Sequence, residues 1–173
     1  MKIFKYLFLL IFIASCNAPQ AVYDYDEQAN FSTYRSYGIY PDLRTGLSQL
    51  DERRLIESID RAMRSKQLSA SEDPDLLLNI YSEEFRKESD SRLGIGVGGT
   101  GRNVGVGVSG GIPIGGTETY LRLTFDLIDA NTNALVWQAV VESVFDLDAS
   151  PEMRQQKFDA IVEKALKGYP PKR

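Results

Sequence analysis

The sequence contains no histidine and only one cysteine among its 173 residues. Without histidine, the chain lacks the side chain that most often acts as a general base or metal ligand near neutral pH. A serine–histidine–aspartate triad therefore cannot form, and a lone cysteine cannot form an intramolecular disulfide. A serine–lysine pair or paired carboxylates are the catalytic groups that these absences leave open.

Basic residues are outnumbered by acidic ones. The chain has 20 lysines and arginines against 24 acidic residues, which gives a net charge of -4. Loss of a leader containing Lys2 and Lys5 would leave 18 basic residues against 24 acidic ones, a net charge of -6. An acidic domain gains nothing from phosphate contacts, so we predict neither nucleic acid nor a polybasic contribution to membrane binding.

The most apolar run of the sequence is too short to span a membrane. It covers about twelve residues, Ile3–Ala14, whereas a spanning helix needs roughly 20. Lysines begin the segment, and small residues stand directly before Cys16. A basic start, an apolar middle and small residues at the end are the layout of a secretory signal.

The position of Cys16 after small residues resembles the bacterial lipobox, in which the thiol is acylated and becomes the mature N-terminus. Ile13 stands where the lipobox usually has leucine. We therefore predict a signal peptide over 1–15 and a lipidated N-terminus with a tether over 16–20. Asn17, in place of the aspartate of an inner-membrane sorting rule, favours an outer-membrane lipoprotein that faces the periplasm. The alternative is an ordinary signal peptide with an incidental cysteine.

Residues 21–173 have the length of one domain and alternate between strand and helix patterns. We predict an α+β fold: a two-layer sandwich of a mostly antiparallel sheet with two helices on one face. The apolar strand at 76–81 is expected to be buried on both faces. The predicted strands are 22–26, 36–40, 76–81, 120–128 and 134–145, and the predicted helices run from 49 to about 67 and from 151 onward.

Local signals mark the ends of these elements. Ser48 and Ser150 stand where N-caps are expected, and a proline comes directly after the second of them. Asn133 closes the turn between the last two strands, because asparagine tolerates left-handed geometry. On the first helix, the apolar stripe is predicted to face the sheet. The residues predicted on the other face are Arg53, Arg54, Glu57, Arg61 and Arg64.

Residues 94–116 contain 11 of the 14 glycines. Glycine alternates there with branched residues, a pattern typical of a strand with one bare face, so we predict a glycine-rich β-hairpin. The segment also matches G-x-G-x-x-G at 96–101. A dinucleotide site needs a helix after this motif, whereas residues 102–108 have a strand pattern, so no nucleotide is predicted.

Four aspartates are the candidates for carboxylate chemistry. Asp24 and Asp26 share one face of a predicted strand, and Asp126 and Asp129 lie at the end of another. Such pairs could hold Ca²⁺ or act as acid and base, but alternating aspartates more often line a solvent face. Asp129 fits a turn, and Asp126 fits a surface ion pair with Arg122. A catalytic pair would require Asp24 or Asp26 in a cleft opposite Asp126, within about 5–10 Å.

Aromatic residues form two groups with open interpretations. Trp137, with Tyr120 and Phe125, could form a ligand platform, although large aromatics at strand spacing more often pack in the core. The tyrosines of the N-terminal part could form an interface or cover edge strands of a small sheet. These tyrosines are Tyr23, Tyr25, Tyr34, Tyr37 and Tyr40.

Several motifs occur in the order found in a known family. They are Val22–Asp26, Phe31–Tyr34, Pro74–Leu77, Asp126–Ala130 with Leu135–Trp137, and Tyr169–Pro171. Together they resemble the bacterial lipoprotein family known as domain of unknown function 4136. Asn133 departs from the glycine expected in its turn. The resemblance implies an envelope lipoprotein and supplies no activity, substrate or catalytic residue.

These observations predict a lipid-anchored protein of the cell envelope that acts as a non-catalytic binding or structural module. Its expected partners are the membrane, through Cys16, and another envelope protein. We assign no catalytic residue, cofactor or metal site. One alternative is an auxiliary subunit of an envelope transport or assembly machine. The alternative of a different class is a carboxylate-dependent hydrolase of envelope polymers.

Overall fold

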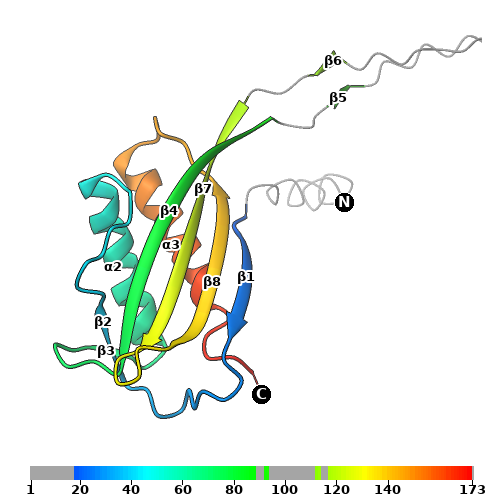
Figure 1. Ribbon diagram of the computed structural model, residues 1–173. Helices are drawn as coiled ribbons and strands as arrows, with labels where there is room; N and C mark the ends of the chain where they lie inside the picture. The colour runs from blue at the N-terminus through cyan, green and yellow to red at the C-terminus, as the bar shows by residue number, and fades with distance from the viewer. Residues whose placement is uncertain (1–17, 89–91, 94–111, 114–116, 173) are drawn as a thin grey trace, which may run out of the picture.

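Alternating apolar residues build a six-stranded sheet, and two helices cover one of its faces (Figure 1). The computed structural model describes residues 18–88, 92–93, 112–113 and 117–172. The strand order is β1-β8-β7-β4-β2-β3, and every pair is antiparallel except β2 with β3 and β2 with β4. The predicted α+β class, with a mostly antiparallel sheet and both helices on one face, is confirmed.

The helices and the strands of the main sheet occur in the predicted order, with one short strand added. The strands of the main sheet are β1 (Gln20–Tyr25), β2 (Ser36–Ile39), β3 (Ser69–Ala70), β4 (Leu76–Glu88), β7 (Thr117–Asp129) and β8 (Leu135–Val144). The helices are α2 (Gln49–Ser65) and α3 (Pro151–Leu166). The two-residue strand β3 was not predicted.

The core lies between the sheet and the helices. Strand β4 contributes Leu76, Leu78 and Ile80 to it, all fully buried. The prediction that this strand is buried on both faces is wrong, because the helices cover one face only and Tyr81 on the other face is exposed. Other large core residues include Tyr37, Leu121, Leu123, Phe125, Leu127, Trp137 and Val141 from the sheet and Leu55, Ile59, Met63, Phe158, Ile161, Val162 and Leu166 from the helices.

Both helices begin at the predicted serine caps. The Ser48 hydroxyl accepts a hydrogen bond from the Asp51 backbone N–H at 3.2 Å, and the Ser150 hydroxyl accepts one from the Met153 N–H at 3.3 Å. Each cap satisfies a backbone donor that the first turn of the helix leaves free. None of the described helices is both long and apolar enough to cross a bilayer.

The turn between β7 and β8 is held by Asp129. Its carboxylate accepts hydrogen bonds from the backbone N–H groups of Asn131 and Thr132, both at 2.9 Å. The Thr132 hydrogen bond is the main reason that the pKa of Asp129 is held below its usual value. Asn133 has a φ of 55°, which confirms the predicted left-handed residue.

Strand β1 contacts the end of α3 and the residues that follow this helix. The Tyr23 hydroxyl donates a 2.5 Å hydrogen bond to the carbonyl of Lys164 near the end of α3. Gly168 passes directly beneath the Tyr23 ring, where a β-carbon would lie 2.6 Å from a ring atom. Only glycine leaves room for this approach, so the end of the chain packs against the first strand.

Strand β1 starts two residues earlier than predicted and ends at Tyr25, so Asp26 lies beyond it. A second, two-stranded sheet pairs β5 (Arg92–Leu93) with β6 (Ile112–Pro113). Of the predicted hairpin over 94–116, only Ile112 and Pro113 are among the described residues. The signal peptide over 1–15 and Cys16 also lie outside them.

Candidate functional surfaces

The face of the sheet opposite the helices is not covered by any other described element (Figure 1). At its centre the register aligns Glu83, Arg122 and Glu142, which we call the face cluster. The Arg122 guanidinium bonds the Glu83 carboxylate at 3.0 Å and the Glu142 carboxylate at 2.7 Å. A row of cross-strand ion pairs therefore crosses three strands on this face.

Aromatic side chains lie beside the face cluster, toward the C-terminal end of β4 and the N-terminal end of β7. The rings of Phe85 and Tyr120 stack with their centroids 5.6 Å apart. The Arg122 guanidinium lies 5.0 Å from the centre of the Phe85 ring, and the Lys87 ammonium lies 5.7 Å from that of Tyr120. The uncovered face thus offers flat apolar area with fixed charges beside it.

The structure brings some of the predicted carboxylates together and separates others. Asp24 and Asp126 lie on the uncovered face, but Gln138 of β8 stands between them in the ladder. The Gln138 amide donates a 2.7 Å hydrogen bond to Asp126. Two strand spacings, about 10 Å, separate the backbones of the two aspartates. The predicted ion pair between Asp126 and Arg122 is wrong, because Arg122 bonds the two glutamates instead.

A pocket of about 220 Å³ lies at the end of β1. Asp24 and Asp26 both line it, whereas Asp126 does not. The Asp26 carboxylate accepts a hydrogen bond from the Gln28 backbone N–H at 2.8 Å, as a turn residue does. The pocket therefore contains the predicted pair Asp24 and Asp26. It does not contain Asp126, the opposing carboxylate that a glycosidase-like site would require.

The aromatic groups are mainly structural. Trp137 is fully buried on the helix side, 5.7 Å from Tyr169 and 6.2 Å from Tyr23 between ring centroids. The packing interpretation is confirmed, and the platform with Tyr120 is wrong because Tyr120 lies on the opposite face. Within the described residues, the Trp137 indole N–H has no hydrogen-bond partner.

The predicted tyrosine cluster does not form one surface. Tyr37 is buried and donates a hydrogen bond to Asp60. The Tyr34 hydroxyl donates to the Asp129 carboxylate at 2.9 Å, and burial together with this carboxylate raises the pKa of Tyr34 to about 12. These contacts tie loops and edge strands to the sheet, which is the second of the two interpretations.

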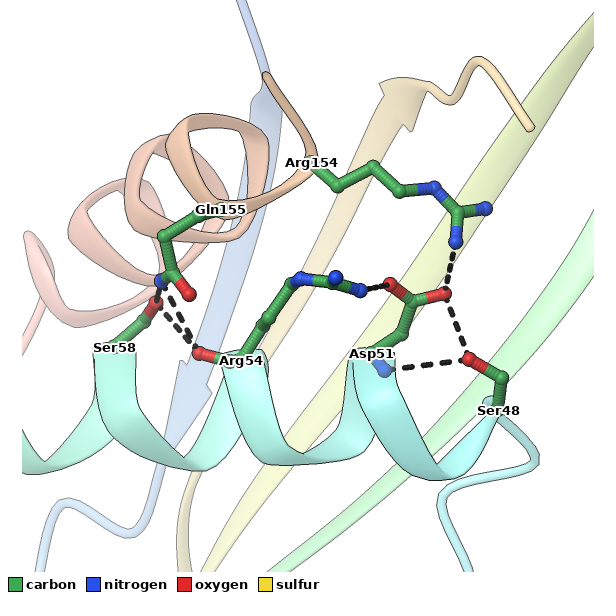
Figure 2. Close-up of polar contacts among 6 residues, drawn as sticks. All are labelled: Ser48, Asp51, Arg54, Ser58, Arg154 and Gln155. Atoms are coloured by element: carbon green, nitrogen blue, oxygen red, sulfur yellow. Dashed lines mark hydrogen bonds and ion pairs between the residues drawn. The ribbon is translucent and has the colours of Figure 1, made fainter. Parts of the chain in front are cut away.

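Sequence patterns did not reveal the polar contact between the helices (Figure 2). Asp51 lies between two arginines: its carboxylate bonds Arg54 at 2.7 Å and Arg154 at 2.8 Å. We call these three residues the seam cluster. The Ser48 hydroxyl also donates to the same carboxylate at 3.0 Å. Asp51 is buried, and the arginines from both helices neutralise its charge there.

A second polar group lies farther along the same two helices. The Ser58 hydroxyl donates a 2.6 Å hydrogen bond to Asp159 and accepts one from Gln155 at 2.9 Å. Arg61 forms an ion pair with Asp159. Burial would raise the pKa of Asp159, but the hydrogen bonds from Ser58, Arg61 and Gln155 outweigh it and lower that pKa. The N-terminal turns of α2 and α3 contact each other, and residues farther along α2 contact residues farther along α3, so the two helices run parallel.

Arg54 and Arg61 therefore lie at the contact with α3, and their predicted place on the face away from the core is wrong. The other three residues of the predicted polar face, Arg53, Glu57 and Arg64, are exposed. The available signal was a polar stripe at helical spacing beside the apolar one, at positions 51, 54, 58, 61 and 65. Beyond the seam a groove of about 650 Å³ opens between the C-terminal halves of the helices, with Lys66, Glu163 and Lys167 among its lining residues.

Another pocket, of about 230 Å³, lies at the start of α3. Val144, Phe145 and Met153 line it together with Arg154 and Lys157. The Arg154 guanidinium lies over the Phe145 ring, 5.2 Å from its centre. The Lys157 ammonium donates a long 3.4 Å hydrogen bond to the Ser143 hydroxyl. This pocket combines an apolar lining with two cationic groups and the acidic Asp146.

Taken together, the fold and its surfaces define an α+β domain with one free sheet face. Residues 21–171 match the family described as "Domain of unknown function (DUF4136)", and the chain belongs to this family. The resemblance inferred from the sequence motifs is thereby confirmed. No curated protein sequence matches the chain.

Solved structures share the fold at low sequence identity. A DUF4136 family protein from Bacteroides thetaiotaomicron is 11% identical, with a TM-score of 0.53 over 88% of this chain and 97% of that one. The PelC dodecamer from Paraburkholderia phytofirmans is also 11% identical, with a TM-score of 0.53 over 90% and 99%. A PDZ domain protein from Parabacteroides distasonis is 13% identical, with a TM-score of 0.50 over 95% of this chain. This chain spans only 39% of the length of that protein.

Proposed function

We propose that this chain is a lipoprotein of the bacterial cell envelope, held in the outer membrane through Cys16 and facing the periplasm. Its domain acts there as a non-catalytic binding module. The lipobox-like segment that ends at Cys16 supports the anchor, and membership of the DUF4136 family supports the class. Only three residues separate Cys16 from β1, so the anchor holds the domain close to the lipid.

The uncovered sheet face carries the proposal for binding. Its polar side chains are arranged across the strands as fixed, mutually paired charges, and Phe85 and Tyr120 supply flat apolar area beside them. Aromatic and arginine side chains with limited freedom are the groups that dominate protein–protein interfaces. The expected partner is another envelope protein.

One fold relative favours a second candidate. PelC is described as a dodecamer, and the likeness covers nearly all of that protein. An auxiliary subunit of an envelope transport or assembly machine, working as an oligomer of this chain, is therefore the second candidate. In that case the free face contacts a neighbouring copy.

The anchor is tested by Cys16→Ser, which removes the thiol that would be acylated. We expect the variant to leave the membrane fraction and to lose incorporation of a palmitate label. Ser15→Ala keeps a small residue before the cysteine and should remain membrane-bound. A Cys16→Ser protein that still sediments with membranes contradicts the lipoprotein proposal.

The binding face is tested by a photo-crosslinking amino acid at Tyr81, which is exposed on the uncovered face. Glu57, exposed on α2, is the matched control position. We expect one discrete product from position 81 and none from position 57. A product of twice the mass of the chain favours the oligomer, and equal labelling at both positions contradicts a binding face.

The alternative function, hydrolysis of envelope polymers, is tested by an assay for released saccharide fragments. Saccharide fragments released from envelope polysaccharide by the wild type, and not by an Asp24→Asn/Asp26→Asn variant, would contradict a non-catalytic role. We expect no release from either protein.

A further inference from the structure

One end of the domain gathers six elements that are far apart in sequence, including the last residues of β4 and the first of β7, because Tyr120 pairs with both Phe85 and Val144. β1 begins there, because Gln20 pairs with Glu142 near the end of β8. The loop 145–150 leads from β8 into α3, and the ion pair between Asp51 and Arg154 brings the first turn of α2 beside the first turn of α3. We call this region the anchor end, since the chain enters it from Cys16.

The anchor end exposes large apolar side chains. Leu147 in the loop is 54% exposed, and Leu50 and Met153 in the first turns of α2 and α3 are exposed as well. Beside Met153 lies the pocket of about 230 Å³, with Arg154 and Lys157 in its lining. Exposed apolar side chains with a long lysine side chain close by suit the boundary between acyl chains and lipid phosphates.

The length of chain before β1 determines which surface the lipid can reach. Four residue steps join Cys16 to Gln20, so their α-carbons are at most about 14 Å apart. Strand β8 has 10 residues and is about 30 Å long. With β1 lying along β8, the anchor end is within reach of the bilayer, whereas the opposite end, with the β7–β8 turn, is a full strand length away.

We propose that the anchor end rests on the lipid surface, with Leu50, Leu147 and Met153 in the interfacial layer and Lys157 toward lipid phosphates. This inference rests on the proposed lipid anchor. It directs the β7–β8 turn away from the membrane and leaves free the part of the uncovered sheet face that lies toward this turn.

The charges of the molecule argue against the other broad surface. The uncovered sheet face carries Asp24, Glu83, Asp126 and Glu142 against Arg122 and Lys87, so acidic groups outnumber basic ones among these residues, and anionic lipids repel a net acidic surface. The anchor end also contains acids, Asp146 and Glu152 among them, so net charge does not attract it to the membrane. Its apolar side chains carry the contact, and the acyl chains keep them there.

Site-directed spin labels can measure this orientation in the full lipoprotein. The acylated Cys16 leaves no other thiol, so Leu147→Cys gives a single labelling site. Leu135→Cys is the matched control, because Leu135 is 50% exposed and lies at the opposite end of β8. Both proteins are reconstituted into vesicles of phosphatidylethanolamine and phosphatidylglycerol at high dilution. We expect collisions with a water-soluble nickel chelate to be several-fold less frequent at position 147 than at position 135.

The outcomes separate the two proposals. Protein that floats with vesicles and shows equal access at both positions overturns the membrane-facing end and leaves the lipoprotein intact. Protein that does not float contradicts the anchor itself. Protection at position 147 that disappears on dilution shows that a second copy covers the end, which also overturns the inference. A Leu147→Ser/Met153→Ser variant should still float, and a label at Leu50→Cys should then become several-fold more accessible.

Discussion

The seam cluster and the face cluster lie on opposite sides of the sheet and are built with inverse chemistry. In the seam cluster one carboxylate, that of Asp51, lies between two guanidinium groups. In the face cluster one guanidinium, that of Arg122, lies between two carboxylates. The side chains of the seam cluster are 5% to 17% exposed, and those of the face cluster are 40% to 57% exposed.

This difference in burial determines what each cluster can contribute. A buried charge that loses its partner retains the full cost of desolvation, whereas an exposed ion pair contributes at most about 1 kcal/mol to stability. The seam cluster therefore holds the two parallel helices in register. The face cluster is free to exchange its partners for those of another molecule at little cost to the fold.

The largest expected effect comes from removing the shared carboxylate. Asp51→Ala leaves Arg54 and Arg154 buried without an acid, and we expect the free energy of unfolding to fall by about 3–5 kcal/mol. Urea denaturation measures this change. Glu57→Ala, at an exposed position of the same helix, should change stability by less than about 0.5 kcal/mol. A loss as small as that of the control would remove the distinction between the two clusters.

A double-mutant cycle sharpens the same point. Combining Asp51→Ala with Arg154→Met removes one of the two stranded cations, so the double variant should be more stable than the sum of the single changes predicts. We expect a coupling energy of about 1–3 kcal/mol, measured by urea denaturation of all four proteins. Strict additivity would show that Arg154 does not interact with Asp51.

Acid titration tests the second polar group between the helices, which contains the half-exposed Asp159. The pKa of Asp159 is lowered in the folded protein, so its carboxylate stabilises the fold above its unfolded pKa of about 3.9. That contribution is lost as the pH falls through the lower, folded pKa. Because Asp159 is 45% exposed, we expect Asp159→Asn to remove at most about 1 kcal/mol. The loss should be seen at pH 7 and should shrink below pH 4. A pH-independent difference would contradict the ionic contribution.

The smallest effect on stability is expected on the uncovered face. Arg122→Gln breaks two exposed ion pairs, and the free energy of unfolding should fall by less than about 1 kcal/mol, by an amount that decreases with added salt. The same variant should weaken the crosslink formed at Tyr81. A stable variant with unchanged crosslinking would show that the face cluster takes no part in binding.

Much of the fold could be predicted because its signals are local. Ser48, Ser150 and Asn133 each mark the end of an element through the geometry of their own backbone. Period-two and helical patterns likewise indicated most strands, both helices and the two layers. The short β3 has no such pattern, because two residues cannot show a period.

The surfaces could not be predicted in the same way, because they depend on pairing between distant segments. Gln138 separates Asp24 from Asp126 only because β1 lies beside β8, and no local pattern specifies that neighbour. Arg54 faces inward because α3 packs beside α2 in parallel, although its position on the helix is also compatible with solvent. Which charges meet is thus a property of register and docking.

The arrangement of β1 also has a mechanical consequence. A protein held by its first residues and pulled by a bound partner transmits the load through β1, along the axis of that strand. The hydrogen bonds between antiparallel strands lie perpendicular to the strand axis. All six residue pairs between β1 and β8 therefore resist the pull together, in shear, instead of opening one after another. The Tyr23 hydroxyl and its bond to the end of α3 add a lateral fastening to the same strand. If the chain is anchored as proposed, the first strand would bear the tension between the membrane and a partner.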